Sequence, residues 1–268
     1  MIRASLTGII LATCALEARA QTVTVTSSTH RVETQAFGYD WDFNNGEIDS
    51  AISTALSGSF FDTVFVDLNE WYGGHVGTGT GSVDSTLSES YIGALFDLYA
   101  SCLNVGVFQA DCSSVGVLDT KFTIHTRRRA VIDFEALCYD DYSWAFAYVK
   151  KVGAGPNILS LDVFGNDDGG AAKTTWLQVG NYEFYAEGNC GAFGTYGTSD
   201  DSTCVVDVKI RLFHEADYNA SGGVDLADRS AFLAAYNAGS LNADFNGDGV
   251  LSKADRHGFL ASWNASQQ

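Results

Sequence analysis

Near the end of this 268-residue chain, one arrangement of oxygen-bearing side chains occurs twice. The first copy spans residues 217–228 and the second spans residues 244–255. Positions 1, 3, 5, 9 and 12 are Asp217, Asn219, Ser221, Asp225 and Asp228 in the first copy, and Asp244, Asn246, Asp248, Ser252 and Asp255 in the second. Oxygen donors at alternate positions of a turning chain can surround a hard cation, and Ca²⁺ takes about six to eight of them.

The two copies also share the residues that let the chain turn around an ion. Gly222 and Gly249 occupy position 6, where a Cβ atom would hinder the sharp bend. Position 7 contributes only its main-chain carbonyl oxygen, so Gly223 and Val250 complete the two ligand sets. This spacing is that of a twelve-residue calcium loop of the EF-hand type. The sequence therefore predicts two bound calcium ions, one in each loop.

The two loops differ at position 5. Ser221 carries no charge there, whereas Asp248 supplies a carboxylate. Because a site with fewer carboxylates attracts Ca²⁺ less strongly, we expect the first loop to bind its ion more weakly than the second.

A short helix is predicted after each loop. Apolar residues recur there at i, i+1 and i+4, which creates one apolar face on a helix. They are Phe232, Leu233 and Tyr236 after the first loop, and Phe259, Leu260 and Trp263 after the second. Residues 209–213, just before the first loop, alternate in the manner of a strand. Residues 214–268 are therefore predicted to form a small all-α module.

This duplicated unit, with an exit helix, no entry helix and Asp at position 12, resembles the type I dockerin module. The resemblance covers residues 214–268. It implies a secreted bacterial protein whose C-terminal module binds a cohesin-like domain on a scaffold or cell surface. The helix positions that contact cohesin in dockerins correspond to Leu226, Ala227, Leu233 and Ala234, and to Lys253, Ala254, Leu260 and Ala261. These positions lack the paired hydroxyl groups of well-known dockerins.

The N-terminus has the pattern of an export signal. Arg3 is followed by a mostly apolar stretch at 4–16 and by Ala18-Arg19-Ala20, which fits an A-x-A cleavage site. Residues 1–20 are therefore predicted to be a signal peptide. A lipoprotein signal ending at Cys14 is the alternative. No other stretch approaches the roughly 20 apolar residues that span a bilayer, so we expect a secreted or cell-surface-associated protein without a membrane span.

Residues 21–213 are predicted to form one antiparallel β-sandwich domain of jelly-roll-like type. Short alternating runs rich in threonine, valine and aromatic residues are separated by Gly, Asn, Asp and Ser clusters. Such runs include 22–26, 63–67, 121–125, 130–134, 143–149, 159–163, 182–186 and 205–213. Only residues 48–55 have a spacing that could suit a helix.

The cysteines are compatible with disulfides in an oxidising compartment. Removal of the signal peptide would take away Cys14 and leave five cysteines. The sequence contains no C-x-x-C pair, which would have indicated zinc or redox chemistry. The nearest pairings along the chain are Cys102 with Cys112 and Cys190 with Cys204. Cys138 would then be a buried apolar residue.

The formal net charge of −18 excludes binding to nucleic acid or anionic membranes by charge alone. No pattern of catalytic residues stands out. Asp40-Trp41-Asp42 could place two carboxyl groups on one strand face, as a glycosidase needs, and Glu70-Trp71-Tyr72 could contact a sugar by stacking. A solvated strand face and a loop covering the core are the simpler interpretations of these two motifs.

We therefore expect a secreted, non-enzymatic calcium-binding protein whose dockerin-like module anchors a β-sandwich, with a role in polysaccharide binding or breakdown. Two alternatives remain open: a polysaccharide-active hydrolase or lyase with its active site on the sandwich, or a carbohydrate-binding protein whose calcium loops are only structural. An enzyme should have acids converging on a concave face, and a binding protein should have a planar row of exposed aromatic side chains. The aromatic residues expected to decide this are Trp41, Trp71, Tyr72 and Trp176.

Overall fold

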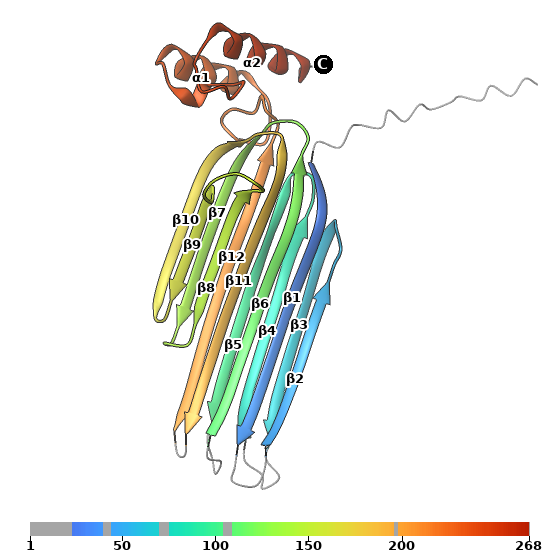
Figure 1. Cartoon of the computed structure of the whole chain (residues 1–268), viewed down its shortest axis with the longest axis vertical. Helices are drawn as coiled ribbons and strands as arrows, with labels where there is room; N and C mark the ends of the chain where they lie inside the picture. The colour runs from blue at the N-terminus through green and yellow to red at the C-terminus, as the bar shows by residue number, and fades with distance from the viewer. Residues whose placement is uncertain (1–22, 40–43, 70–74, 104–108, 196–197, 268) are drawn as a thin grey trace, which may run out of the picture.

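The computed structural model describes residues 23–39, 44–69, 75–103, 109–195 and 198–267. It consists of two six-stranded antiparallel sheets packed face to face, followed by two short α-helices. The strands are long and run along the length of the sandwich, and the helices lie at one end of it (Figure 1). The predicted antiparallel β-sandwich is thus confirmed. The predicted signal peptide at 1–20 lies outside the described residues.

Sheet A consists, in spatial order, of β2 (Asn44–Ser53), β1 (Val23–Tyr39), β6 (Gln109–Ile124), β11 (Gly180–Thr195), β8 (Trp144–Lys151) and β9 (Leu159–Phe164). Sheet B consists of β10 (Asp167–Leu177), β7 (Arg128–Tyr139), β12 (Ser199–Phe213), β5 (Tyr91–Leu103), β4 (His75–Leu87) and β3 (Gly58–Asn69). From β5 onward the chain crosses repeatedly between the sheets, so strands that follow one another in sequence often lie in different layers.

The core of the sandwich lies between the two sheets and is built by alternate residues of each strand. Phe134 of β7 and Phe184 of β11 are fully buried and stack with ring centres 5.6 Å apart. Phe96 fits beside Gly116, where a Cβ atom would approach the ring to 2.5 Å. The alternation that predicted the strands thus also places the apolar side chains in the core.

The helical spacing at 48–55 was misleading. Residues up to Ser53 belong to β2, at the edge of sheet A. Ile48 and Ile52 are each 60% exposed and lie on one face of this strand. A separation of four residues places side chains on one face of a helix and equally on one face of a strand, so the spacing could not distinguish the two.

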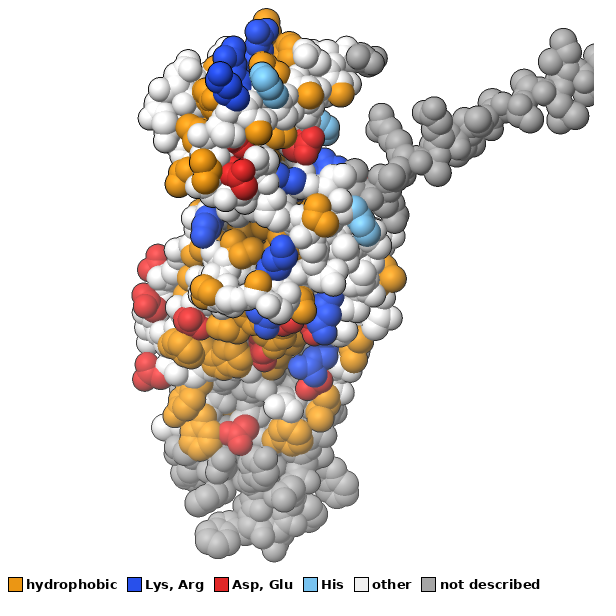
Figure 2. Space-filling model, turned by 45° about the horizontal axis from the view of Figure 1, so that its top comes forward, with side chains coloured by type: hydrophobic (Ala, Val, Ile, Leu, Met, Phe, Trp, Pro, Cys, Tyr) orange, Lys and Arg blue, Asp and Glu red, His pale blue; other side chains and the backbone are white. Residues whose placement is uncertain are grey.

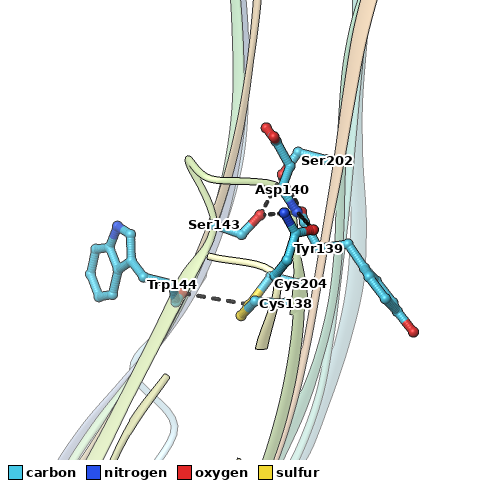
Figure 3. The surroundings of a disulfide bond; sticks show 8 residues. Cys138, Tyr139, Asp140, Ser143, Trp144, Ser202 and Cys204 are labelled. Atoms are coloured by element: carbon cyan, nitrogen blue, oxygen red, sulfur yellow. Dashed lines mark hydrogen bonds between the residues drawn. A yellow bond between two sulfur atoms is a disulfide. The ribbon is translucent and has the colours of Figure 1, made fainter. Parts of the chain in front are cut away.

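The cysteine pairing also differs from the prediction. The structure forms a disulfide between Cys138 and Cys204, which face each other on the neighbouring strands β7 and β12 (Figure 3). Cys190 was predicted to pair with Cys204, but Cys204 is bonded to Cys138 instead. Cys102, Cys112 and Cys190 are buried free thiols. A hydrogen bond with Cys102, together with burial, raises the pKa of the Cys112 thiol, so these two predicted partners are neighbours without a disulfide.

After β12 ends at Phe213, the described chain contains α1 (Leu226–Asn237), the 3-10 helix η1 (Leu241–Ala243) and α2 (Lys253–Ala265). The two α-helices follow the two predicted calcium loops. No helix in the described ranges is long and apolar enough to cross a bilayer. We refer to residues 214–267 as the C-terminal module.

Candidate metal centre

The first loop is held by its own acidic side chains. The carboxylate of Asp217 accepts the main-chain N–H of Ser221 at 2.9 Å and that of Gly222 at 2.8 Å. The carboxylate of Asp228 accepts the N–H of Asn219 at 2.9 Å and that of Asp225 at 2.8 Å. Positions 1 and 12 therefore close the loop from opposite ends, and each of the four carboxylate oxygens accepts one main-chain N–H.

The second loop repeats this arrangement with one difference, since its position-1 aspartate accepts an N–H from position 4 where Asp217 accepts one from position 5. Asp244 accepts the N–H groups of Gly247 and Gly249, each at 2.8 Å. Asp255 accepts the N–H of Asn246 at 2.9 Å and that of Ser252 at 2.7 Å. Gly222 and Gly249, at position 6, have φ values of 96° and 83°, in the left-handed region that glycine adopts without strain. The sequence repeat is thus also a repeat of backbone geometry.

Positions 9 and 12 have a second role, because they cap the helices. Asp225 is the N-cap of α1 and accepts the N–H of Ala227, while Asp228 at N3 accepts the N-cap N–H. Ser252 and Asp255 form the same capping box on α2. These side chains satisfy donors that a helix start leaves unpaired, so their presence has a structural explanation independent of a metal.

The four position-1 and position-12 carboxylates are buried, since Asp217, Asp228, Asp244 and Asp255 are all at most 9% exposed. Burial, together with the nearby charge of Asp228, raises the pKa of Asp217 even though main-chain N–H groups donate to it. At Asp255, burial acts to raise the pKa, but the hydrogen bonds from Asn246 and Ser252 outweigh it and lower the pKa. Carboxylates that are buried close together repel one another, and a bound cation would relieve this repulsion.

The donor set fits calcium better than a metal that needs nitrogen or sulfur ligands. Within the residues that the structure describes, no three His, Cys, Asp or Glu side chains converge to hold a metal by themselves. Each loop brings two buried aspartates together and leaves Asp225 and Asp248 exposed. The further ligands would be amide, hydroxyl and carbonyl oxygens, as in calcium loops. A carboxylate oxygen that accepts a single N–H keeps a lone pair for an ion. Oδ2 of Asp255 accepts both the N–H and the hydroxyl group of Ser252, which leaves Oδ1 of Asp255 as the better placed of its two oxygens.

The two loops differ at positions 4 and 5, where the sequences also differ. The hydroxyl of Ser221 donates to the carbonyl of Gly223 at 3.3 Å, which engages a predicted ligand oxygen. The carboxylate of Asp248 instead accepts the N–H of Val250 at 2.8 Å and leaves the position-7 carbonyl available. At position 4, Ala220 has a φ of 59°, where the second loop has Gly247. A non-glycine residue in this region is strained.

The two helices pack through a small aromatic core. Phe232 of α1 and Phe259 of α2 stack with ring centres 4.0 Å apart and are fully buried. The indole N–H of Trp263 donates to the carbonyl of Asp225 at 2.8 Å, so the second helix also supports the first loop. The predicted apolar helix faces therefore meet each other.

The opposite helix faces present small residues. Ala227, Ala234, Ala254 and Ala261 are exposed. Gly258 instead packs against Phe245, whose ring would lie 3.0 Å from an added Cβ atom. Figure 2, which brings the helical end forward, shows lysine, arginine and histidine side chains there, among hydrophobic ones.

An aromatic group on the outer face of sheet A was missed in the sequence. Phe146 and Tyr148 of β8 and Tyr185 of β11 lie together, with Tyr148 and Tyr185 stacked at 5.7 Å between ring centres. The hydroxyl group of Tyr148 donates to Glu183, and that of Tyr185 donates to Glu187. In Figure 3 the neighbouring Trp144 side chain points away from the disulfide and the core. The strand predicted at 143–149 implied an outward face with Phe146 and Tyr148 on it, but only strand pairing brings Tyr185 to this face.

The aromatic residues expected to decide between sugar binding and catalysis do not settle this question. Trp41, Trp71 and Tyr72, with the acids beside them, lie outside the described residues. Trp176 of β10 packs against the C-terminal module, with its ring centre 6.0 Å from that of Phe245.

A shallow depression of about 230 Å³ on sheet B is lined by acids and an aromatic residue, including Asp84, Tyr91 and Asp207. Asp84 and Asp207 flank Leu95 on adjacent strands. Two strand spacings of about 4.8 Å place their main chains roughly 10 Å apart, well beyond the carboxyl separation of a retaining glycosidase, which is about 5 Å. Asp207 also forms an ion pair with Lys209 at 2.9 Å. This arrangement does not favour carboxyl catalysis.

Comparison with known proteins identifies no family. No protein-family model matches the chain, and no curated protein matches it. Among solved structures, it is similar to that of infectious bursal disease virus Gx strain, with 6% identity and a TM-score of 0.18, over 69% of this chain and 57% of that chain. The VP2 subviral particle of infectious bursal disease virus shows 8% identity and a TM-score of 0.15, over 84% and 78% of the two chains.

Proposed function

We propose that this protein binds two calcium ions through its C-terminal module and that the module, which is dockerin-like, anchors the β-sandwich to a cohesin-like extracellular domain. The supporting observation is the repetition of one hydrogen-bonded loop geometry around two pairs of buried aspartates. Helix capping alone explains positions 9 and 12. It does not explain why Asp217 and Asp244 are also buried facing them.

The anchoring role draws on the outer faces of α1 and α2. Exposed alanines on both helices let another protein surface approach closely, and the duplication supplies two similar faces. The localisation that goes with this role is outside the cell, as the N-terminal pattern at 1–20 suggests. The finer fold assignment, a jelly-roll-like sandwich followed by a dockerin module, belongs to the same proposal.

The anchoring role predicts a calcium-dependent partner on the surface of the source organism. With the full chain as bait, a cohesin-like β-sandwich should be retained in calcium and released by a chelator. Ala234→Asp and Ala261→Asp together should reduce retention about tenfold or more, because two buried charges at an interface cost well over 1.4 kcal/mol. Ala172→Asp, on the exposed surface of β10, is the matched control. Retention that is independent of calcium or unaffected by the double variant would contradict anchoring.

Polysaccharide binding by the sandwich is a second candidate, favoured by the aromatic group of Phe146, Tyr148 and Tyr185. Aromatic side chains with hydroxyl and carboxylate groups beside them can pack on the apolar face of a sugar and hydrogen-bond its edge. In this version the calcium loops are structural. Among the residues that the structure describes, no group of acids favours a hydrolase or lyase in a comparable way.

Polysaccharide binding predicts that the aromatic group is required. Affinity electrophoresis in gels containing plant or microbial polysaccharides should retard the wild-type chain. Tyr148→Ala with Tyr185→Ala should weaken this binding about tenfold, since each aromatic contact contributes about 0.5–1.5 kcal/mol beyond its buried area. Phe61→Ala is the control, because Phe61 is 69% exposed on the other sheet. Equal mobility of wild type and double variant in every gel would exclude this surface.

A further inference from the structure

The sandwich and the C-terminal module meet around a buried arginine. Arg127, just before β7, is 8% exposed, and its Nη2 donates to the main-chain carbonyl of Asp244 at 2.8 Å. Its guanidinium carbon lies 4.0 Å from the ring centre of Trp176 and 5.1 Å from that of Phe245. A sandwich residue is thus held between an aromatic ring of its own domain and positions 1 and 2 of the second loop.

Nη2 is the guanidinium nitrogen of Arg127 that donates a hydrogen bond in this contact. The Nε and Nη1 atoms of Arg127 are buried without hydrogen-bond partners among the described residues. Burial lowers the pKa of Arg127 to about 10, against the opposing charges of Asp244, Glu215 and Asp255. It therefore stays charged at neutral pH. Because it donates to the main-chain carbonyl of Asp244, the carboxylate oxygens of the loop remain available to an ion.

Other contacts hold the second loop to the same end of the sandwich. The indole N–H of Trp176 donates to the carbonyl of Asn242 at 3.4 Å. Gly247, at loop position 4, packs on Gln178, whose amide nitrogen would lie 2.6 Å from an added Cβ atom. Positions 1, 2 and 4 of this loop therefore all touch the sandwich. A change in loop conformation must alter these contacts.

We propose that Arg127 couples calcium occupancy of the second loop to the order of the adjoining sandwich end, at residues 126–130 and 174–180. This inference rests on the calcium binding proposed above. A loop closed around its ion presents the Asp244 carbonyl and the Phe245 ring to Arg127. A loop that opens withdraws both and leaves a buried charge without its partner, which is unfavourable. Calcium thereby fixes the orientation of the module on the sandwich.

Hydrogen exchange measured by mass spectrometry on the whole chain tests this coupling. Calcium, compared with chelator, should slow exchange in the loops at 217–228 and 244–255. It should also slow exchange about tenfold or more at 126–130 and 174–180, as expected for a hydrogen bond from a charged group. Other strands of the sandwich should exchange equally in both conditions.

Variants separate the link from the binding. Arg127→Met should keep calcium protection in the loops and lose it at 126–130 and 174–180. Arg127→Lys keeps the positive charge but not the planar guanidinium, so it should lose most of the calcium-dependent protection at 126–130 and 174–180. It serves as the test variant if Arg127→Met does not fold. Arg229→Met is the matched control, because Arg229 contacts Trp263 within the module at 5.5 Å.

The outcomes distinguish the two proposals. One outcome in the wild-type chain is that calcium slows exchange in the loops without slowing it at 126–130 and 174–180. That result would overturn the coupling and leave the proposal of calcium binding intact. A sandwich end that stays protected in the Arg127 variants would overturn Arg127 as the link. Loops that calcium does not protect would overturn both proposals.

Discussion

Removal of calcium is expected to unfold the C-terminal module while the sandwich remains folded. In a chelator at low ionic strength, the circular dichroism signal of α1 and α2 should be lost, and excess calcium should restore it. The physical reason is the burial of Asp217, Asp228, Asp244 and Asp255 in a module whose own core is small. Each ion stabilises the folded state by about 2.7 kcal/mol when free calcium is 100 times the dissociation constant.

The matched control for this experiment is magnesium. Mg²⁺ requires a smaller, near-octahedral set of ligands and retains its water, so it should restore the helices poorly at equal concentration. The β signal of the sandwich serves as an internal reference in every sample. Helicity that is unchanged in chelator would show that capping and the Phe232–Phe259 contact suffice without an ion.

Asp244→Ala is expected to abolish the tighter calcium site, and Asp217→Ala the weaker one. Asp244 is a predicted ligand and also accepts two main-chain N–H groups, from Gly247 and Gly249. Its loss removes two charge-assisted hydrogen bonds as well as a carboxylate. We expect the affinity of that loop to fall about 100-fold or more, as a loss of about 3 kcal/mol implies. Isothermal titration calorimetry of each variant measures the remaining site.

We expect the second loop to have the higher calcium affinity because of positions 5 and 4. The second loop has Asp248 and Gly247 there, and the first has Ser221 and Ala220. Glu89→Ala, which removes an exposed carboxylate from the sandwich, controls for the general loss of negative charge. Survival of the tighter site in Asp244→Ala would reverse the assignment.

The sequence alone was sufficient to locate the two loops and their helices. The hydrogen bonds that the carboxylates at positions 1 and 12 accept within each loop join residues at most nine apart, such as Asn219 and Asp228. Such contacts depend on local spacing, and a duplicated spacing produced a duplicated geometry. The strands were predictable for a related reason, since side chains alternate between the two faces of any strand. Residues 48–53 show the limit of this reasoning, because spacings of four suit both elements.

Only the tertiary structure decided which distant residues meet. Cys138 and Cys204 are 66 residues apart and pair because β7 and β12 are neighbours. Tyr148 and Tyr185 form an aromatic surface because β8 and β11 align in register. Arg127 reaches the second loop because the module packs on the end of the sandwich where β7 begins. Strand order and register depend on the packing of the whole chain, and no short spacing in the sequence carries that information.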